Sequence, residues 1–136
     1  MTDFELLQMA LDARKRAYTP YSHFKVGAAL LTADGKVYQG CNIENAAYTP
    51  TNCAERTAFF KAVAEGERSF TAIAVVGAPE GQEADQFCPP CGVCRQVMEE
   101  FCDPAAFRII LADPEHGTVS YRLNEILPYG FGPANL

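Results

Sequence analysis

The stretch FRIILADPEHGTVSYR, residues 107–122, determines how the predicted sheet ends. Its apolar run Phe107–Ala112 and the following run Thr118–Arg122 each predict a strand. Only Asp113–Gly117 joins them, whereas a parallel crossover needs roughly a dozen residues or more. The last two strands are therefore predicted to be antiparallel, with no helix between them.

The chain before this pair alternates between strand and helix patterns. Helical spacing of apolar residues occurs in three segments, which are Asp3 to about Tyr18, Cys53–Glu65 and Cys91–Cys102. Strand patterns occupy Phe24–Thr32, Val37–Cys41 and Thr71–Gly77, and an Asp-Gly turn joins the first two as a hairpin. This order predicts an α/β fold in which helices cover both faces of a mixed five-stranded sheet. The Pro- and Gly-rich tail, Asn124–Leu136, is expected to begin with a short helical turn.

Length and charge restrict the classes of partner. The 136 residues correspond to one domain, residues 1–136. The formal net charge of −6 opposes a phosphate backbone, so no nucleic acid partner is expected. The longest apolar runs, such as Ala72–Ala78, are too short to span a membrane, and the N-terminus has no export signal. We therefore expect a cytoplasmic protein with no membrane partner that binds a small neutral ligand.

Three of the six cysteines have the spacing of a metal site. Cys91 and Cys94 are two candidate ligands on one helical turn, and Cys53 begins a different helix. Three protein ligands leave the fourth zinc position open for water, which is the catalytic arrangement. The only histidines, His23 and His116, lie outside the motif, so the prediction is one zinc ion per chain in an all-thiolate site.

Glu55 lies two residues after a candidate ligand. It can face the metal without binding it, as a general acid and base should. Zinc lowers the pKa of its bound water and so makes hydroxide available near neutral pH. The pattern is the signature of zinc deaminases, in which hydroxide attacks C4 of cytosine while a glutamate transfers the protons.

Structural alternatives remain for these residues. A Cys-x-x-Cys pair alone serves a structural zinc site or a redox pair, and Cys41, Cys88 or Cys102 offers the fourth ligand that a structural site wants. Cys88 is the most plausible of the three because it stands two residues before Pro90. Glu55 also fits a capping box with Asn52, in which it serves only the helix end.

Five segments carry a resemblance to a known family. They are YSHFKVGAA (21–29), NIENA (42–46), TNCAERTA (51–58), PCGVCRQ (90–96) and LP (127–128). With these segments the chain resembles the small homotetrameric cytidine deaminases from about Tyr18 to Phe131. The resemblance implies a three-layer α/β/α fold of the cytidine deaminase type. The chain departs from the family pattern at Cys88-Pro89.

The resemblance also implies roles in substrate binding. Asn42 and Glu44 would bind the ribose hydroxyls, which an amide and a carboxylate two residues apart on an extended segment can reach. Phe24 would pack against the pyrimidine ring. The backbone of Ala54 and the carboxyl of Glu55 would bind the edge of the cytosine. Without the family, Asn42 and Glu44 belong to a solvated loop and Phe24 to the core of the first strand.

The implied homotetramer shares its sites between subunits. Tyr48, and Phe131 near the tail, would reach the site of a neighbouring subunit. An aromatic residue in a Gly- and Pro-rich tail has no evident core to join. The alternative is a tail that packs on its own subunit.

Arg56 is a candidate for tuning the charge of the metal. Three thiolates and one zinc ion sum to −1, so the metal needs a positive neighbour to remain a good Lewis acid. Two helix N-termini contribute roughly half a charge each, and Arg56 stands three residues after Cys53 with five donors available. Arg95, next to Cys94, is the competing candidate, and a solvent-facing Arg56 is the structural alternative.

The sequence as a whole predicts a zinc-dependent cytidine deaminase of pyrimidine salvage. It would hydrolyse cytidine, and deoxycytidine, to uridine or deoxyuridine and ammonia. One alternative is a related deaminase that acts on another nucleoside or on nucleic acid, which the acidic charge and the antiparallel last pair oppose. Another is a structural zinc module that binds a protein partner.

Overall fold

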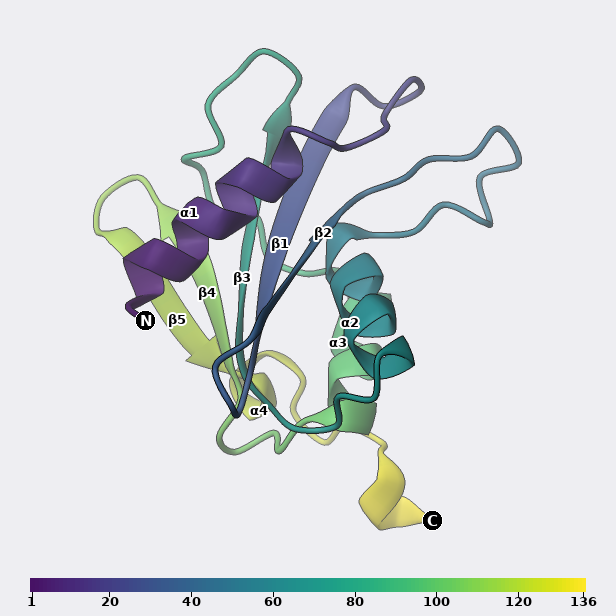
Figure 1. The fold of residues 1–136 in the computed structure, drawn as a ribbon, viewed down its shortest axis with the longest axis vertical. Coiled ribbons are helices and arrows are strands. Elements are labelled where there is room, and N and C mark those ends of the chain that lie inside the picture. Colours follow the sequence, from purple (N-terminus) through teal and green to yellow (C-terminus); the bar gives the residue numbers. More distant parts are fainter.

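The computed structural model describes residues 1–136 and contains one mixed sheet between helices (Figure 1). The strands are β1 (Phe24–Thr32), β2 (Val37–Cys41), β3 (Phe70–Pro79), β4 (Arg108–Asp113) and β5 (Gly117–Arg122). The helices are α1 (Asp3–Arg14), α2 (Ala54–Ala64), α3 (Gly92–Phe101) and α4 (Leu123–Ile126), and a 3₁₀ turn covers Pro133–Asn135. The strand order is β2-β1-β3-β4-β5. Only β3 and β4 are parallel, and β4 pairs with β5 antiparallel as predicted.

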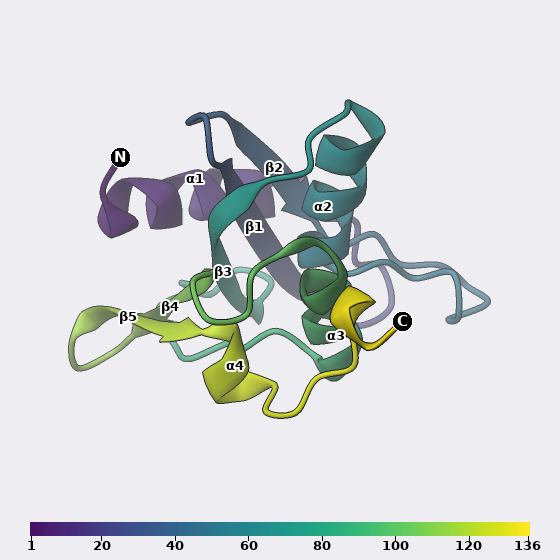
Figure 2. The ribbon, with the colours of Figure 1, turned by 90° about the horizontal axis from the view of Figure 1, so that it is seen from below.

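Helices cover both faces of the sheet, which makes three layers. Helix α1 lies on one face, and α2 and α3 lie on the other, as Figure 2 shows along the sheet. Side chains alternate along β3 because a strand has a period of two residues. Ile73 and Val75 join the core under α2 and α3, whereas Ala74 and Val76 join the core under α1. The predicted α/β class, the three layers and the mixed five-stranded sheet are confirmed. No helix is long and apolar enough to cross a bilayer.

Two glycines allow helices to lie directly on the β1–β2 hairpin. A Cβ atom at Gly27 would overlap the backbone oxygen of Ala10 in α1. A Cβ atom at Gly40 would overlap the backbone oxygen of Ala54 and lie 2.6 Å from the backbone nitrogen of Ala58. The first turn of α2 therefore contacts the backbone of β2 directly, and this contact sets the position of the residue before it, Cys53.

The first helix is shorter than predicted. It ends at Arg14 instead of continuing to about Tyr18. The backbone of Tyr18 bonds to the loop after β2 instead, accepting from Glu44 N at 2.9 Å and donating to Asn42 O at 3.0 Å. Ala17 is nevertheless buried, so the apolar spacing continues past the point where the helix stops.

The chain after β5 returns to α3. Arg95 Nη1 donates to Ile126 O at 2.7 Å, and Gln96 Nε2 donates to Phe131 O at 2.8 Å. Figure 2 shows the C-terminal turn beside α3. On the same side of the sheet, the loop between β2 and α2 projects away from the body of the molecule (Figure 1). The expected short turn at the start of the tail is α4, which begins at Leu123.

Candidate metal centre

Two helix N-termini bring the three predicted ligands together. Cys53 is the N-cap residue of α2, Cys91 is the N-cap residue of α3, and Cys94 lies in the first turn of α3. The three sulfur atoms lie within 4.8 Å of one another. Cys53 Sγ is 3.8 Å from Cys91 Sγ, and Cys91 Sγ is 3.6 Å from Cys94 Sγ. Tetrahedral zinc with Zn–S bonds of about 2.3 Å holds its sulfurs about 3.8 Å apart, so the spacing fits this ion.

The surroundings of the sulfurs are electropositive. Both helices direct their N-terminal ends, which are the positive ends of the helix dipoles, at the cluster. Arg56 Nη2 donates a hydrogen bond to Cys53 Sγ at 3.2 Å. Hydrogen bonding from Cys94 and then from Arg56 lowers the pKa of Cys53 to about 5. Cys53 therefore favours the thiolate form that a metal ion requires.

Glu55 is a buried carboxyl beside this cluster. It is only 4% exposed, and it lines a cavity of about 180 Å³ together with Cys53 and Cys91. Burial, which disfavours the charged form, raises the pKa of Glu55 to about 7. A carboxyl with such a pKa can both accept and donate a proton near neutral pH.

The capping-box alternative for Glu55 is wrong. Asn52 is not the N-cap residue of α2, because Cys53 takes that place. The backbone of Asn52 pairs instead with Ile43, and its side chain donates to Thr57 Oγ1 at 3.1 Å. The carboxyl of Glu55 makes no capping bond and remains available to the cavity.

The cluster includes no fourth cysteine. Cys88 lines the same cavity as Glu55, but its sulfur lies outside the three-sulfur group. Burial and then the charge of Glu55 raise the pKa of Cys88 to about 11, so this thiol stays protonated. Cys41 is half-buried on β2, and Cys102 is buried at the end of α3. Three protein ligands beside a cavity are the arrangement of a catalytic zinc site.

Comparison with known proteins agrees with this chemistry. The family model for the cytidine and deoxycytidylate deaminase zinc-binding region matches residues 1–109. A cytidine deaminase of Sporosarcina psychrophila is 50% identical over 135 residues, which cover 97% of this chain and 93% of that protein. The chain belongs to the cytidine deaminase family. A family member from Halalkalibacterium halodurans is also 50% identical, over 126 residues that cover 93% of this chain and 91% of its own.

Solved cytidine deaminases have the same fold. The crystal structure of the enzyme from Burkholderia pseudomallei superposes with a TM-score of 0.86 at 48% identity, covering 96% of this chain and 100% of that one. The enzyme from Mycobacterium tuberculosis gives a TM-score of 0.77 at 35% identity, covering 94% and 95%. The present chain is therefore an enzyme of the hydrolase class from a zinc-binding family.

Asn42, which the resemblance assigns to the ribose, lies in the zinc-site cavity. It lines this cavity with Ala54 and Glu55. Its side chain also organises the start of β1, because Oδ1 accepts from Val26 N and Nδ2 donates to Phe24 O, both at 2.9 Å. An amide group has two donor hydrogens and two acceptor lone pairs, so one of each remains for a ligand.

Glu44 lies outside that cavity, next to the segment before β1. Its Oε1 accepts from Tyr21 N at 3.0 Å and from Ser22 N at 3.1 Å, and the hydroxyl of Ser22 bonds to Oε2. The Ser22 hydrogen bonds lower the pKa of Glu44 and keep it ionised. Glu44 lines a separate surface hollow together with Tyr48.

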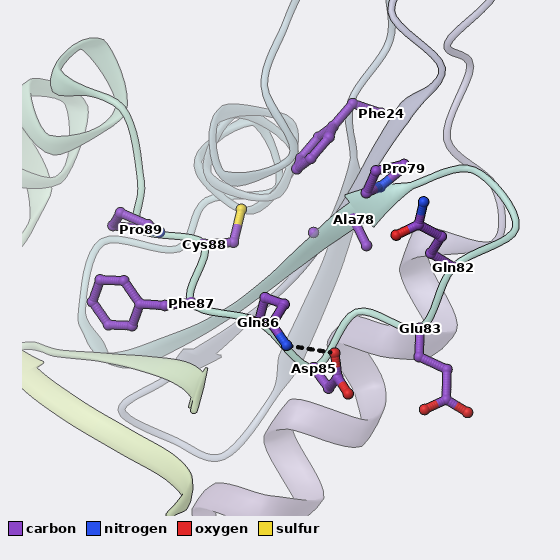
Figure 3. A pocket seen from close by; sticks show the side chains of 11 residues that line it. Phe24, Ala78, Pro79, Gln82, Glu83, Asp85, Gln86, Phe87, Cys88 and Pro89 are labelled. Atoms are coloured by element: carbon purple, nitrogen blue, oxygen red, sulfur yellow. Dashed lines mark hydrogen bonds between the residues drawn. The ribbon is translucent and has the colours of Figure 1, made fainter. Parts of the chain in front are cut away.

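The aromatic residues assigned by resemblance do not line the zinc-site cavity. Phe24 is 39% exposed and lines the neighbouring cavity shown in Figure 3. Tyr48 is 73% exposed on the projecting loop, and Phe131 is 59% exposed in the tail. One chain thus brings together Asn42, Ala54, Glu55 and the cysteines, and it leaves the aromatic groups outside.

Sequence reasoning missed several residues that line the zinc-site cavity. Val26 and Val75 form its apolar wall, and Pro89 borders it beside Cys88. Val26 stands two residues after Phe24 and therefore on the same face of β1, which is a signal that the sequence contained. Arg95 bonds to Pro90 O at 2.8 Å and to Ile126 O, so the structure gives it no contact with a ligand sulfur.

Proposed function

We propose that residues 1–136 act as one domain that hydrolyses cytidine to uridine and ammonia. The observation that carries this proposal is the placement of Glu55, a buried carboxyl with a raised pKa, in the same cavity as the three-sulfur cluster. The family membership and the two relatives named cytidine deaminase support the choice of substrate.

Glu55 carries the protons in this proposal. A zinc ion held by Cys53, Cys91 and Cys94 supplies a Lewis acid that lowers the pKa of water in the cavity. Glu55 takes a proton from the attacking water, delivers it to the ring, and later protonates the departing nitrogen. The pKa of about 7 suits both directions of transfer at neutral pH.

The remaining residues orient the nucleoside. The backbone of Ala54 and the carboxyl of Glu55 bind the cytosine edge, and Phe24 packs near the ring. The free donor and acceptor of Asn42 bind one ribose hydroxyl, and Glu44 binds the other. We infer that deoxycytidine is a second substrate, because losing the 2′-hydroxyl removes one of several contacts. An enzyme that converts free cytidine and deoxycytidine would serve pyrimidine salvage.

A homotetramer with shared sites would complete the pocket. The zinc-site cavity of about 180 Å³ is smaller than the roughly 300–1,000 Å³ typical of ligand sites. Tyr48 and Phe131 are large and exposed, and neither lines the zinc-site cavity of its own chain. We propose that a neighbouring subunit contributes these two side chains, which would close the site over the nucleoside.

Arg56 would tune the charge of the metal. Its bond to Cys53 Sγ places a positive charge beside the sulfur without placing it in the cavity. Hydrogen bonds to Cys53 and Cys94 raise the pKa of Arg56 in spite of its desolvation, so this charge is permanent. We propose that it offsets the surplus negative charge of three thiolates.

The test uses purified protein and three compounds. Cytidine should lose absorbance near the cytosine band and release ammonia, whereas cytidine monophosphate and single-stranded RNA should stay unchanged. A structural zinc module would bind zinc and turn over none of them. Turnover of RNA alone would contradict the nucleoside assignment.

A further inference from the structure

Four side chains and backbone groups at the start of β1 form a closed ring of hydrogen bonds. The hydroxyl of Ser22 donates to Glu44 Oε2 and accepts from Phe24 N, the latter at 3.0 Å. Phe24 O accepts from Asn42 Nδ2 at 2.9 Å. The chain itself closes this ring, because only Ile43 separates Asn42 from Glu44. Ser22 therefore connects Glu44 and Asn42, which the resemblance assigns to the ribose, through the backbone of Phe24.

Other bonds hold the two chain segments of the ring together. Glu44 N donates to Tyr18 O at 2.9 Å, and Tyr18 N donates to Asn42 O at 3.0 Å. Further along, Val26 N donates to Asn42 Oδ1 at 2.9 Å. The segment before β1 thus stays paired with the segment after β2 without help from the Ser22 hydroxyl. The effect of this hydroxyl is on the side chain of Glu44.

The carboxylate of Glu44 has one acceptor position left for a ligand. Its Oε1 accepts from the backbone nitrogens of Tyr21 and Ser22, and its Oε2 accepts from the Ser22 hydroxyl. An ionised carboxylate has about four lone pairs, two on each oxygen. Oε1 is therefore saturated, whereas Oε2 keeps one lone pair. A ribose hydroxyl that binds Glu44 would use the same oxygen atom that Ser22 holds.

The hydroxyl of Ser22 fixes both the direction and the charge of this oxygen. A serine hydroxyl has one donor hydrogen, and an ionised carboxylate can only accept, so the hydrogen points at Glu44. Hydrogen bonding from Ser22 is also the main reason why the pKa of Glu44 is lowered. Ser22 is exposed and Glu44 is half-buried, so the loss of one hydroxyl should change the stability of the fold little.

We propose that Ser22 is a positioning residue for recognition of the sugar, which holds Glu44 Oε2 where a ribose hydroxyl can donate to it. This proposal rests on the proposed function, in which Glu44 binds one hydroxyl of the nucleoside. Ser22 itself touches neither the reacting atoms nor the metal cluster, and it does not line the zinc-site cavity. Its loss should therefore weaken binding of the sugar and leave the chemical step unchanged.

The experiment measures kcat and KM for cytidine with zinc-loaded wild type, Ser22→Ala, Ser22→Thr and Ser69→Ala. Ser22→Ala should raise KM about tenfold and keep kcat within about twofold, because Glu44 binds the sugar equally in the ground state and the transition state. Ser22→Thr keeps the hydroxyl and should keep the wild-type KM. Ser69 is an exposed serine before β3 and serves as the matched control.

Two results would speak against different claims. A Ser22→Ala variant with the wild-type KM would overturn the positioning role and leave the proposed function standing. Wild-type protein that forms no uridine from cytidine would remove the proposed function itself.

A substrate without ribose hydroxyls separates positioning from a structural role. With 2′,3′-dideoxycytidine, Glu44 has no hydroxyl at C2′ or C3′ to bind, so Ser22→Ala should change kcat/KM by less than about twofold. For cytidine, Ser22→Ala should likewise have little further effect in a Glu44→Ala background, because residues that act through one contact are not additive. Equal losses with both substrates, or additive losses in the double variant, would mean that Ser22 supports the fold and would overturn the proposal.

Discussion

Arg56 Nη2 donates a hydrogen bond to Cys53 Sγ across the first turn of α2, over 3.2 Å. The metal ligand and its positive partner therefore belong to one rigid helical turn. Arg56 Nε is buried and has no hydrogen-bond partner, so Nη2 carries the contact with the cluster. The positive charge is thus directed at the sulfur cluster.

Replacing Arg56 with Gln should shift the pH–rate profile to higher pH. Without the positive charge the metal is a poorer Lewis acid, so water in the site loses its proton at a higher pH. A shift of one pH unit corresponds to about 1.4 kcal/mol. Zinc retention should also weaken, while affinity for cytidine stays nearly the same. Arg68→Gln removes an equal charge from beyond the end of α2 and serves as the control. An Arg56→Gln profile and zinc content equal to those of wild type would show that Arg56 has no part in the site.

Metal analysis should find one zinc ion per chain. Cys53→Ala should lose both the metal and the turnover, because two thiolates hold zinc much less well than three. Cys88→Ala should keep its zinc, since the sulfur of Cys88 lies outside the cluster. Plasma mass spectrometry of the dialysed proteins measures the zinc content of each variant. A zinc-free Cys88→Ala variant would mean that the ligand set has been assigned wrongly.

Glu55→Gln should keep the fold and the zinc but lose turnover. General acid and base groups supply roughly 10²–10⁴-fold in rate. Because one carboxyl transfers every proton here, turnover should fall by about 10⁴-fold or more. Steady-state kinetics measure it, with circular dichroism and zinc content as controls. Near-normal turnover would exclude Glu55 as the proton carrier.

The active form should sediment as a homotetramer with sites built from two chains. Glu55→Gln and Phe131→Ala should each impair the enzyme, for different reasons. Because the affected side chains would come from different subunits at one site, mixed tetramers should regain part of the activity. Sedimentation velocity followed by assay of the mixture tests this. A fully active monomer would contradict the shared site, and the tail would then pack on its own chain.

The ion pair between α1 and β4 should make stability depend on pH in the acid range. Arg108 donates to both carboxylate oxygens of Asp3 at 2.8 Å, and this bonding lowers the pKa of Asp3 below its usual 3.8. The stabilisation by this ion pair is therefore complete above the pKa of Asp3 in the unfolded chain. It is lost as the pH falls through the lowered pKa of Asp3 in the folded protein. Since both side chains are more than a third exposed, Arg108→Gln should cost about 0.5–1 kcal/mol at neutral pH.

Urea denaturation of wild type and Arg108→Gln at about pH 7, 4 and 3 measures this effect. The difference in unfolding free energy between wild type and Arg108→Gln should be greatest at neutral pH and smallest at the lowest pH. A constant difference would mean that Arg108 stabilises the protein by packing and not by charge.

Local patterns were enough to predict the elements and the cluster of three cysteines. The five-residue link between β4 and β5 permits only one strand direction, and Cys91 and Cys94 are neighbours on a helix by spacing alone. Where the prediction failed, distant partners decide the structure. The first helix stops early because the backbone of Tyr18 bonds to Asn42 and Glu44, far along the chain. The helix at Glu55 begins one residue later than a capping box would require, because Asn52 pairs with Ile43.

The neighbours of the substrate residues could not be predicted from the sequence either. The shared ribose role of Asn42 and Glu44 stays a prediction of the resemblance. In the structure Asn42 bonds to β1 itself, whereas Glu44 bonds to the residues just before it. The spacing of Val26 places it on the same face of β1 as Phe24, but a shared face does not by itself show that the residue lines a cavity. Such assignments depend on which surfaces meet, and this information is not local.

The absence of a side chain at Gly40 links sheet packing to metal chemistry. The backbone of α2 lies so close to this residue that one added carbon would have to push the helix outward, and Cys53 at its end would move away from Cys91 and Cys94. Three sulfur atoms can bind one ion only if their spacing changes little, so such a displacement would weaken the site. A larger side chain at residue 40 should thus weaken zinc binding, although the residue does not line the zinc-site cavity.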